Sequence, residues 1–275
     1  MKIAVLSDIH GNVPALEAVL ADLDQWGPER VVVNGDLINR GPNSLPVLQM
    51  LLERLPTAVF LKGNHETYVL QCLEEDFPRD GPRYEMHRFA WWTFHQLGEE
   101  MRRVASWAAN MDLTDLDGGS LHFTHGSRLG NRDGISPRTT DEELPAKLGD
   151  RRDLFVASHT HLPMIRDFQG VLVVNSGSVG APFDRDPRSA YARLSFSRGR
   201  WLAEIRRLEY DRERAMRDYE ESGFCAGGGP LTRVMLKEME LSRGLMAPWL
   251  RAYRDAVSAG ELTLEASVER FLAQC

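Results

Sequence analysis

Five short polar stretches follow one another along the chain in a fixed order, and three of them come directly after segments that resemble buried strands. They are Asp8-Ile9-His10, Gly35-Asp36, Gly63-Asn64-His65-Glu66, His125-Gly126 and His159-Thr160-His161. The three strands are predicted at residues 2–7, 30–34 and 57–61, with helices at 13–26 and 44–54 between them. This alternation indicates a parallel sheet with right-handed crossovers. The first three stretches then lie at the carboxyl ends of its strands, where open α/β sheets hold their ligands.

The rest of the chain is predicted to contain a helical segment, a second group of strands and a helical tail. Residues 83–111 are predicted to form two helices broken near Gly98, and strands return near Leu113 and at 119–124 and 154–158. Two hairpins follow, and we expect them to belong to a second sheet packed on the first; they pair residues 163–168 with 171–175, and 189–196 with 200–208. Residues 210–275 are predicted to be a helical tail.

The polar stretches supply seven oxygen and nitrogen ligands and one further histidine, which suits two divalent metal ions that share one carboxylate. Side chains two residues apart on an extended segment point to the same side. Asp8 and His10 can therefore meet one cation, and so can His159 and His161. Such ligands suit Mn, Fe, Zn, Ni or Co, and the absence of cysteine from these positions argues against a structural zinc site.

The composition of the chain limits which kinds of partner it is expected to bind. Its 275 residues carry a formal net charge of −7, so long nucleic acid, which selects basic surfaces, is a poor partner. Bound dications would reverse that sign locally and admit a small anionic substrate. The scattered Cys72, Cys225 and Cys275 indicate free thiols in a reducing compartment. No stretch approaches the roughly 20 apolar residues of a membrane span. We therefore expect a cytoplasmic protein with no membrane partner.

Taken together, the five stretches resemble the motifs of the calcineurin-like metallophosphoesterase superfamily: Asp-X-His, Gly-Asp, Gly-Asn-His, His-Gly and His-X-His. The resemblance covers roughly residues 1–208, and Ser158 stands where glycine is usual. It implies an α/β fold, a four-layer αββα sandwich of two mixed β-sheets flanked by helices. The metallophosphoesterase domain would span residues 1–209, with a helical cap insertion at about 77–111. A helical C-terminal extension would follow over residues 210–275.

The resemblance also implies a role for each polar residue. One metal ion would be held by Asp8, His10 and His161, the other by Asn64, His125 and His159, with Asp36 as the bridge. Manganese is the metal we expect, with Fe, Zn, Ni or Co as alternatives. His65 would face the substrate and either donate a proton to the leaving oxygen or stabilise charge there. The nucleophile would be a water or hydroxide whose pKa the metals lower.

Two further segments resemble different branches of the superfamily. Residues 35–41 are close to the run Gly-Asp-X-Val-Asp-Arg-Gly of Ser/Thr phosphatases, which would make Arg40 a phosphate-binding residue. Asn39 replaces the aspartate that pairs in that branch with the proton-donating histidine. Residues 174–180, Val-Asn-Ser-Gly-Ser-Val-Gly, resemble a run of the small bacterial and archaeal phosphodiesterases. Their backbone N–H groups either approach an anion or form a turn that supports the His159–His161 loop.

These observations predict a dinuclear metal-dependent phosphoesterase that acts on a small phosphate ester, as a phosphodiesterase or nucleotide phosphohydrolase. The alternative is a Ser/Thr-type phosphomonoesterase, which Arg40 and Glu66 favour. A non-catalytic scaffold is disfavoured because no ligand of the pattern is missing. The helix that carries His87, Trp91 and Trp92 is either a packed aromatic helix or a cap over the metal site. We expect the tail to affect stability or assembly into a homodimer more than chemistry.

Overall fold

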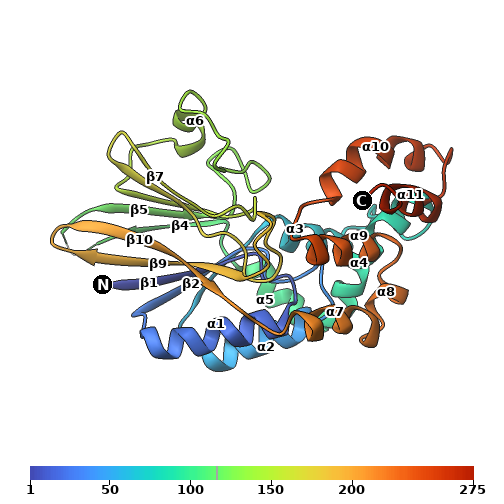
Figure 1. The fold of residues 1–275 in the computed structure, drawn as a ribbon, viewed down its shortest axis with the longest axis horizontal. Coiled ribbons are helices and arrows are strands. Elements are labelled where there is room, and N and C mark those ends of the chain that lie inside the picture. Colours follow the sequence, from blue (N-terminus) through green and yellow to red (C-terminus); the bar gives the residue numbers. More distant parts are fainter. Residues whose placement is uncertain (116) are drawn as a thin grey trace.

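The structure is a computed structural model that describes residues 1–115 and 117–275. Two five-stranded sheets face each other within it (Figure 1). The first sheet has the strand order β10 (Arg200–Leu208), β9 (Ser189–Ser197), β1 (Lys2–Leu6), β2 (Arg30–Asn34), β3 (Val59–Leu61). The second has the order β4 (Asn110–Thr114), β5 (Ser120–Thr124), β6 (Leu154–Ala157), β8 (Val171–Asn175), β7 (Met164–Phe168). The predicted α/β fold with two mixed sheets is confirmed.

Each sheet combines three parallel strands with antiparallel neighbours. In the first sheet β1, β2 and β3 are parallel, as predicted, and Val5 of β1 lies opposite Val32 of β2. In the second sheet β5, β6 and β8 are parallel, and the predicted hairpin of β7 and β8 is antiparallel, as expected. All four residues of β6 are buried, as is typical of parallel strands covered on two sides.

The second predicted hairpin lies in a different sheet from the one expected. Its strands β9 and β10 extend the first sheet, where β9 pairs antiparallel with β1 and places Lys2 opposite Ser195. Ala192, Leu194 and Trp201 of this hairpin enter the apolar core between the two sheets. The prediction of the hairpin itself is confirmed, and its assignment to the second sheet is wrong.

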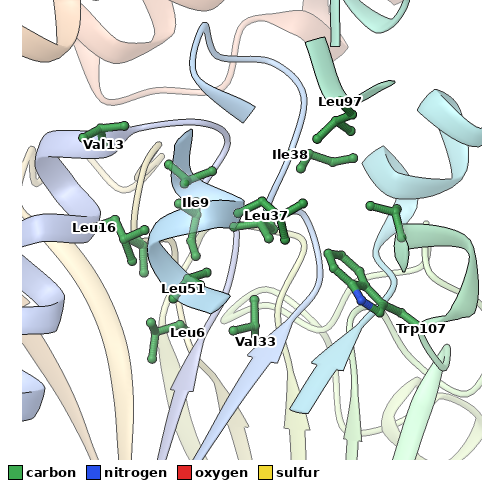
Figure 2. Close-up of a cluster of buried hydrophobic side chains, with 14 of the residues drawn as sticks. Leu6, Ile9, Val13, Leu16, Val33, Leu37, Ile38, Leu51, Leu97 and Trp107 are labelled. Atoms are coloured by element: carbon green, nitrogen blue, oxygen red, sulfur yellow. The ribbon is translucent and has the colours of Figure 1, made fainter. Parts of the chain in front are cut away.

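Helices flank both sheets. The outer face of the first sheet is covered by α1 (Val13–Trp26) and α2 (Ser44–Arg54), as Figure 1 shows, and the core beneath them is drawn in Figure 2. The Asn12 side chain caps α1 by accepting a hydrogen bond from the Ala15 N–H, as expected for an N-cap residue. Over the second sheet the short α6 (Leu144–Leu148) covers Phe155 and Val173.

The remaining helices gather beyond the strand ends, at the right of Figure 1. They are α3 (Asn64–Leu70), α4 (Gly81–Leu97), α5 (Met101–Ser106), α7 (Arg212–Glu221), α8 (Phe224–Gly227), α9 (Leu231–Leu241), α10 (Met246–Ser258) and α11 (Leu264–Leu272). The tail helices α7 to α11 form an apolar core of their own around Trp249. Met86 of α4 belongs to this core, and Phe89 and Trp92 pack against it. The apolar partner of the tail is thus α4 of the predicted cap.

Candidate metal centre

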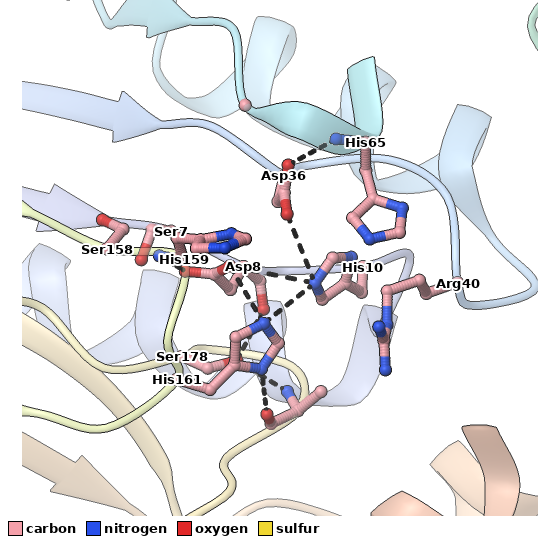
Figure 3. Close-up of polar contacts among 12 residues, drawn as sticks. Ser7, Asp8, His10, Asp36, Arg40, His65, Ser158, His159, His161 and Ser178 are labelled. Carbon is pink, nitrogen blue, oxygen red and sulfur yellow. Dashed lines mark hydrogen bonds and ion pairs between the residues drawn. The ribbon is translucent and has the colours of Figure 1, made fainter. Parts of the chain in front are cut away.

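The predicted ligands lie just beyond the carboxyl ends of parallel strands from both sheets. Asp8 follows β1 and Asp36 follows β2, while Asn64 begins α3 after β3. From the second sheet, His125 follows β5 and His159 follows β6. The two sheets therefore direct polar side chains from distant parts of the sequence toward one place (Figure 3).

Several of these residues have a left-handed backbone conformation, which is uncommon for residues with a side chain. The φ angle lies between 49° and 66° at Asp8, His10, Asp36, His159 and His161. Asn39 and Arg40 share this conformation, with φ of 67° and 65°. Backbone strain of this kind costs on the order of 1–3 kcal/mol per residue and clusters at functional sites.

The first cluster consists of Asp8, His10 and His161, whose ligand atoms all lie within 4.8 Å of one another. His161 Nε2 lies 3.0 Å from Asp8 Oδ1, and His10 Nε2 lies 3.3 Å from His161 Nε2. All three residues are buried. This arrangement can hold one cation between one carboxylate and two imidazoles.

The second cluster consists of Asp36, His125 and His159, also with ligand atoms within 4.8 Å of one another. Asn64 joins it, because its Oδ1 lies 3.1 Å from His125 Nε2. Asn64, His125 and His159 are the residues that the family resemblance implied for the second metal ion.

Asp36 lies between the two clusters. Its Oδ2 is 3.2 Å from His125 Nε2 in the second cluster and 3.9 Å from His10 Nε2 in the first. Its other oxygen, Oδ1, accepts a hydrogen bond of 2.8 Å from the His65 backbone N–H. The carboxylate is therefore fixed by the chain with one oxygen turned to both clusters.

Three of the histidines are oriented by backbone carbonyls behind them. The Nδ1 atoms of His10 and His125 lie 3.2 Å and 2.9 Å from the carbonyl oxygens of Asn39 and Asn34. His161 Nδ1 makes the same contact with the Ala181 carbonyl. A carbonyl only accepts, so Nδ1 carries a proton in each ring and Nε2 faces the clusters. Support of this kind is typical of metal-binding histidines.

The atoms at the centre fit a pair of divalent cations. Asp8 Oδ1 is buried and accepts no hydrogen bond from any residue of the described part of the chain. The facing Nε2 lone pairs of His10 and His161 repel each other unless positive charge lies between them. Burial, and then the neighbouring His65, lower the pKa of His10 well below its ordinary value, so its imidazole is neutral.

His125 shows how much negative charge the site holds. Burial acts to lower its pKa, but the charges of Asp36 and Asp8 outweigh burial and raise the pKa to about 10. In the same site, burial lowers the pKa of His159 to about 4. A proton on His125 Nε2 therefore supplies positive charge at a place where the carboxylates of Asp36 and Asp8 favour a cation.

Glycines allow the two ligand loops to approach each other. A Cβ on Gly63 would lie 2.1 Å from Asp36 Oδ1, and a Cβ on Gly35 would lie 2.6 Å from His125 Nδ1. The glycines of the Gly-Asp and Gly-Asn-His motifs are therefore required by close packing behind the ligands.

Glu66 has a role that the sequence did not predict. Its buried carboxylate accepts hydrogen bonds from the backbone N–H groups of Asp36, Leu37, Ile38 and Gly63. Burial and the charge of Asp36 raise its pKa to about 7. Glu66 thereby joins the Asp36 loop to the Asn64 loop. This contact gives a structural reason for the glutamate that the chain shares with the phosphatase branch.

The run at residues 174–180 supports the ligand loops through its own hydrogen bonds. The N–H groups of Val179 and Gly180 donate to the carbonyls of Ser7 and Asp8, each at 3.0 Å. Ser178 Oγ donates to the Asp8 carbonyl at 2.7 Å. These N–H groups are therefore engaged, and the alternative of a supporting turn is the one that the structure favours.

Ser158, the departure from the usual glycine, belongs to a buried polar chain between the sheets. Its Oγ lies 2.8 Å from Asn34 Nδ2 and 2.9 Å from Ser176 Oγ. Ser176 in turn lies 2.8 Å from Ser7 Oγ. The serine thus links strand ends of both sheets immediately before the His159–His161 loop.

His65 lies beside the two clusters and does not belong to either group of carboxylates and histidines. Asn39 Nδ2 donates to its Nδ1 at 3.0 Å, which places the ring proton on Nε2. Burial lowers the pKa of His65 to about 3, so the imidazole is neutral. Asn39 therefore takes the position of the phosphatase-branch aspartate but supplies no charge.

Arg40 is held by the tail. Its guanidinium pairs with Glu238 of α9, and its carbonyl accepts a 3.0 Å hydrogen bond from Tyr219 of α7. The guanidinium lies 5.6 Å from the ring of Phe183. No local sequence pattern predicts these contacts, because Arg40 and Glu238 are 198 positions apart.

A pocket of about 660 Å³ opens onto the centre. Its walls include the predicted residues Asp36, Arg40, Asn64, His65, His159 and His161. The α4 helix contributes Met86 and Phe89, which favours its interpretation as a cap, while Trp91 is buried against Phe77 and Phe94. The tail contributes Met246 and Leu250 to the same pocket. That the tail affects stability or assembly more than chemistry stays a prediction.

Comparison with known proteins accords with this geometry. The model of the calcineurin-like phosphoesterase superfamily domain matches residues 1–199. The chain belongs to this superfamily. As a member it is a metal-dependent phosphoric ester hydrolase with two candidate metal-binding groups. None of the described helices has the length and apolarity to cross a membrane.

A curated relative supports the family, and a solved structure supports the fold. The chain is 30% identical over 197 residues to phosphodiesterase YfcE of Escherichia coli K12, covering 69% of this chain and 85% of that protein. It is 26% identical over 163 residues to a symmetrical bis(5'-nucleosyl)-tetraphosphatase of Hamiltonella defensa, covering 58% and 57%. A metallophosphoesterase structure from Sphaerobacter thermophilus has a TM-score of 0.66 at 24% identity, covering 88% of this chain and 100% of that one, which shows the fold.

Proposed function

We propose that this phosphoesterase is a dinuclear enzyme that hydrolyses a small phosphodiester or nucleotide. The metal ligands are Asp8, His10, Asp36, Asn64, His125, His159 and His161. The observation that carries the proposal is the position of Asp36 Oδ2, 3.2 Å from His125 Nε2 and 3.9 Å from His10 Nε2. One carboxylate oxygen within reach of both clusters is the arrangement that a shared ligand requires.

Two bound dications would supply the charge that lowers the pKa of an attacking water and stabilises the phosphoryl oxygens. Manganese suits the mixed carboxylate, amide and imidazole set, as do Fe, Zn, Ni and Co. The chain itself supplies the remaining groups. His65 lines the pocket and carries its ring proton on Nε2, from which it can donate a hydrogen bond that stabilises charge on a leaving oxygen. Arg40 lines the same pocket and presents a guanidinium, which suits a phosphate oxygen.

The preference for a diester or nucleotide rests on two observations. The relatives include a protein named as a phosphodiesterase and one named as a bis(5'-nucleosyl)-tetraphosphatase. The pocket of about 660 Å³ is lined partly by α4, α9 and α10, and its volume suits a small molecule better than a protein chain.

A Ser/Thr-type phosphomonoesterase is the second candidate, because Arg40 lines the pocket as that activity requires. Asn39 weighs against it: an amide 3.0 Å from His65 Nδ1 cannot stabilise an imidazolium as a carboxylate does. A cytoplasmic location and a homodimer are further proposals. The free thiols of Cys72, Cys225 and Cys275 support the location. Cell fractionation tests the location, and the mass of the protein in solution tests the homodimer.

A chromogenic phosphodiester and the matching monoester, each assayed with added Mn, Ni, Co or Fe, test the proposal. We expect metal-dependent turnover with the diester preferred. No turnover with any of these metals contradicts the proposal, and a monoester rate far above the diester rate reverses the order of the two candidates.

A further inference from the structure

The pocket has two chemically different walls. The wall formed by the metallophosphoesterase domain carries the candidate ligands, His65 and Arg40. The opposite wall comes from α4, α9 and α10, and its side chains are mainly apolar: Met86, Phe89, Met235, Met246, Trp249 and Leu250. These apolar side chains contribute nothing to binding phosphate, and they favour a ligand that carries an apolar part beside the phosphate.

Leu250 is the clearest sign that this wall faces a ligand. Its side chain is 39% exposed, although Trp249 beside it is fully buried in the tail core. Leu241 of α9 is exposed to the same extent, 37%, but does not line the pocket. The two leucines have similar exposure and different surroundings, which makes them a matched pair.

The tail is fixed in place over the pocket by contacts on several sides. Glu238 pairs with Arg40 and also accepts hydrogen bonds from the N–H groups of Leu245 and Met246, at 2.6 Å and 2.7 Å. Asn43 Nδ2 donates to Asp218 at 3.1 Å. The apolar wall is therefore held opposite the centre, as a preformed binding site requires.

We infer that α9 and α10 form a specificity wall for the ester group that remains attached to the phosphate, and that this wall selects a bulky apolar or aromatic alcohol of about nucleoside size. The inference rests on the proposed phosphodiesterase function. A pocket of about 660 Å³ leaves room beside the phosphate for one such group. Arg83, Arg132 and Arg254 also line the pocket and suit an anionic ligand; the Arg132 guanidinium lies 4.5 Å from the Tyr68 ring centroid.

A series of diesters with one constant leaving group tests the inference. Methyl, phenyl and thymidine-5' p-nitrophenyl phosphates share the leaving group and differ only in the alcohol that faces the wall. In the manganese-loaded full chain, kcat/KM should rise roughly 10- to 100-fold from the methyl to the phenyl ester, chiefly through KM, because an aromatic ring is buried. Inhibition by phenylphosphonate and methylphosphonate should show the same order without turnover.

Variants localise the effect. Leu250→Gln should reduce the phenyl-to-methyl ratio several-fold, while Leu241→Gln should leave it unchanged. Ala247→Phe, at an exposed position that lines the pocket, should fill the space and raise KM for the thymidine ester far more than for the methyl ester. This variant replaces no core residue, so it keeps the test decisive if Leu250→Gln folds poorly.

The possible outcomes distinguish failure of the specificity wall from failure of the proposed phosphodiesterase function. A flat series in the wild type, or equal effects of Leu250→Gln and Leu241→Gln, overturns the specificity wall and leaves the phosphodiesterase intact. Absence of turnover with every diester and every metal overturns the proposed function, and the specificity wall with it.

Discussion

At the scale of single residues, His65 and the seven candidate ligands differ in what surrounds them. The ring nitrogens of His10 and His125 are turned to carbonyls on one side and to the clusters on the other. His65 instead contacts the Asn39 amide and lines the pocket. The surroundings of His10 and His125 suit metal binding, whereas those of His65 suit a contact with the leaving oxygen of the substrate.

His65→Ala should keep both metal ions and slow turnover by roughly 10²- to 10⁴-fold, the range typical of losing a general acid. The loss should shrink for diesters with good leaving groups, since these need little protonation. Rates over a series of leaving-group pKa values measure this. The control is His95→Ala, at an exposed position of α4, which should behave as wild type. An equal loss across the series would point to a role for His65 in position or charge alone.

Contacts between elements explain how the tail reaches the chemistry. Glu238 of α9 is buried and pairs with Arg40 from the loop after β2. Glu238→Gln preserves the shape but removes the charge that fixes the guanidinium, so kcat/KM should fall by about 10-fold, the effect of about 1.4 kcal/mol, with metal content unchanged. The control is Glu240→Gln, whose partner Lys237 forms an exposed pair with it. Equal kinetics for the two variants would show that Glu238 does not position Arg40.

A second contact between elements joins α1 to β9 and β10. Asp22 of α1 accepts hydrogen bonds from Tyr191, Arg193 and Arg206. Burial acts to raise its pKa, but these hydrogen bonds outweigh burial and lower the pKa below 3.8. A lowered folded-state pKa means that the stabilisation is present above about pH 4 and is lost as the pH falls through the folded value.

Asp22→Asn should therefore lower the free energy of unfolding by about 3 kcal/mol near neutral pH, as expected when one partner of a buried charge network is removed. The difference from wild type should narrow as the pH approaches the folded pKa of Asp22. Urea unfolding from pH 7 to well below pH 4 measures it, with the exposed Asp24→Asn as control. A difference that is independent of pH over a range extended below pH 4 would contradict the ionic account.

Across the whole molecule, local patterns predicted the elements, and long-range contacts decided their arrangement. The strand at residues 30–34 and the cap at Asn12 were predictable because each depends on neighbours in sequence. The placement of β9 beside β1 depends on which open edge a hairpin meets, and hairpin residues carry no local signal for that. The residues of the site divide in the same way, into those that local sequence predicts and those that long-range contacts place there. Its ligands stand in short motifs, whereas Glu238 and Leu250 reach the pocket only through tertiary packing.

The measurement that tests the central claim most directly is a manganese titration of chelator-treated protein, with metal content per chain and diester turnover followed together. We predict two metal ions per chain in the wild type, with full activity reached only when the second binds. In Asp36→Asn we predict loss of at least one ion and most of the activity, because one neutral oxygen cannot hold two dications. Full activity with one metal ion or none, or an Asp36→Asn protein with two ions and a near-normal rate, would contradict the shared-carboxylate centre.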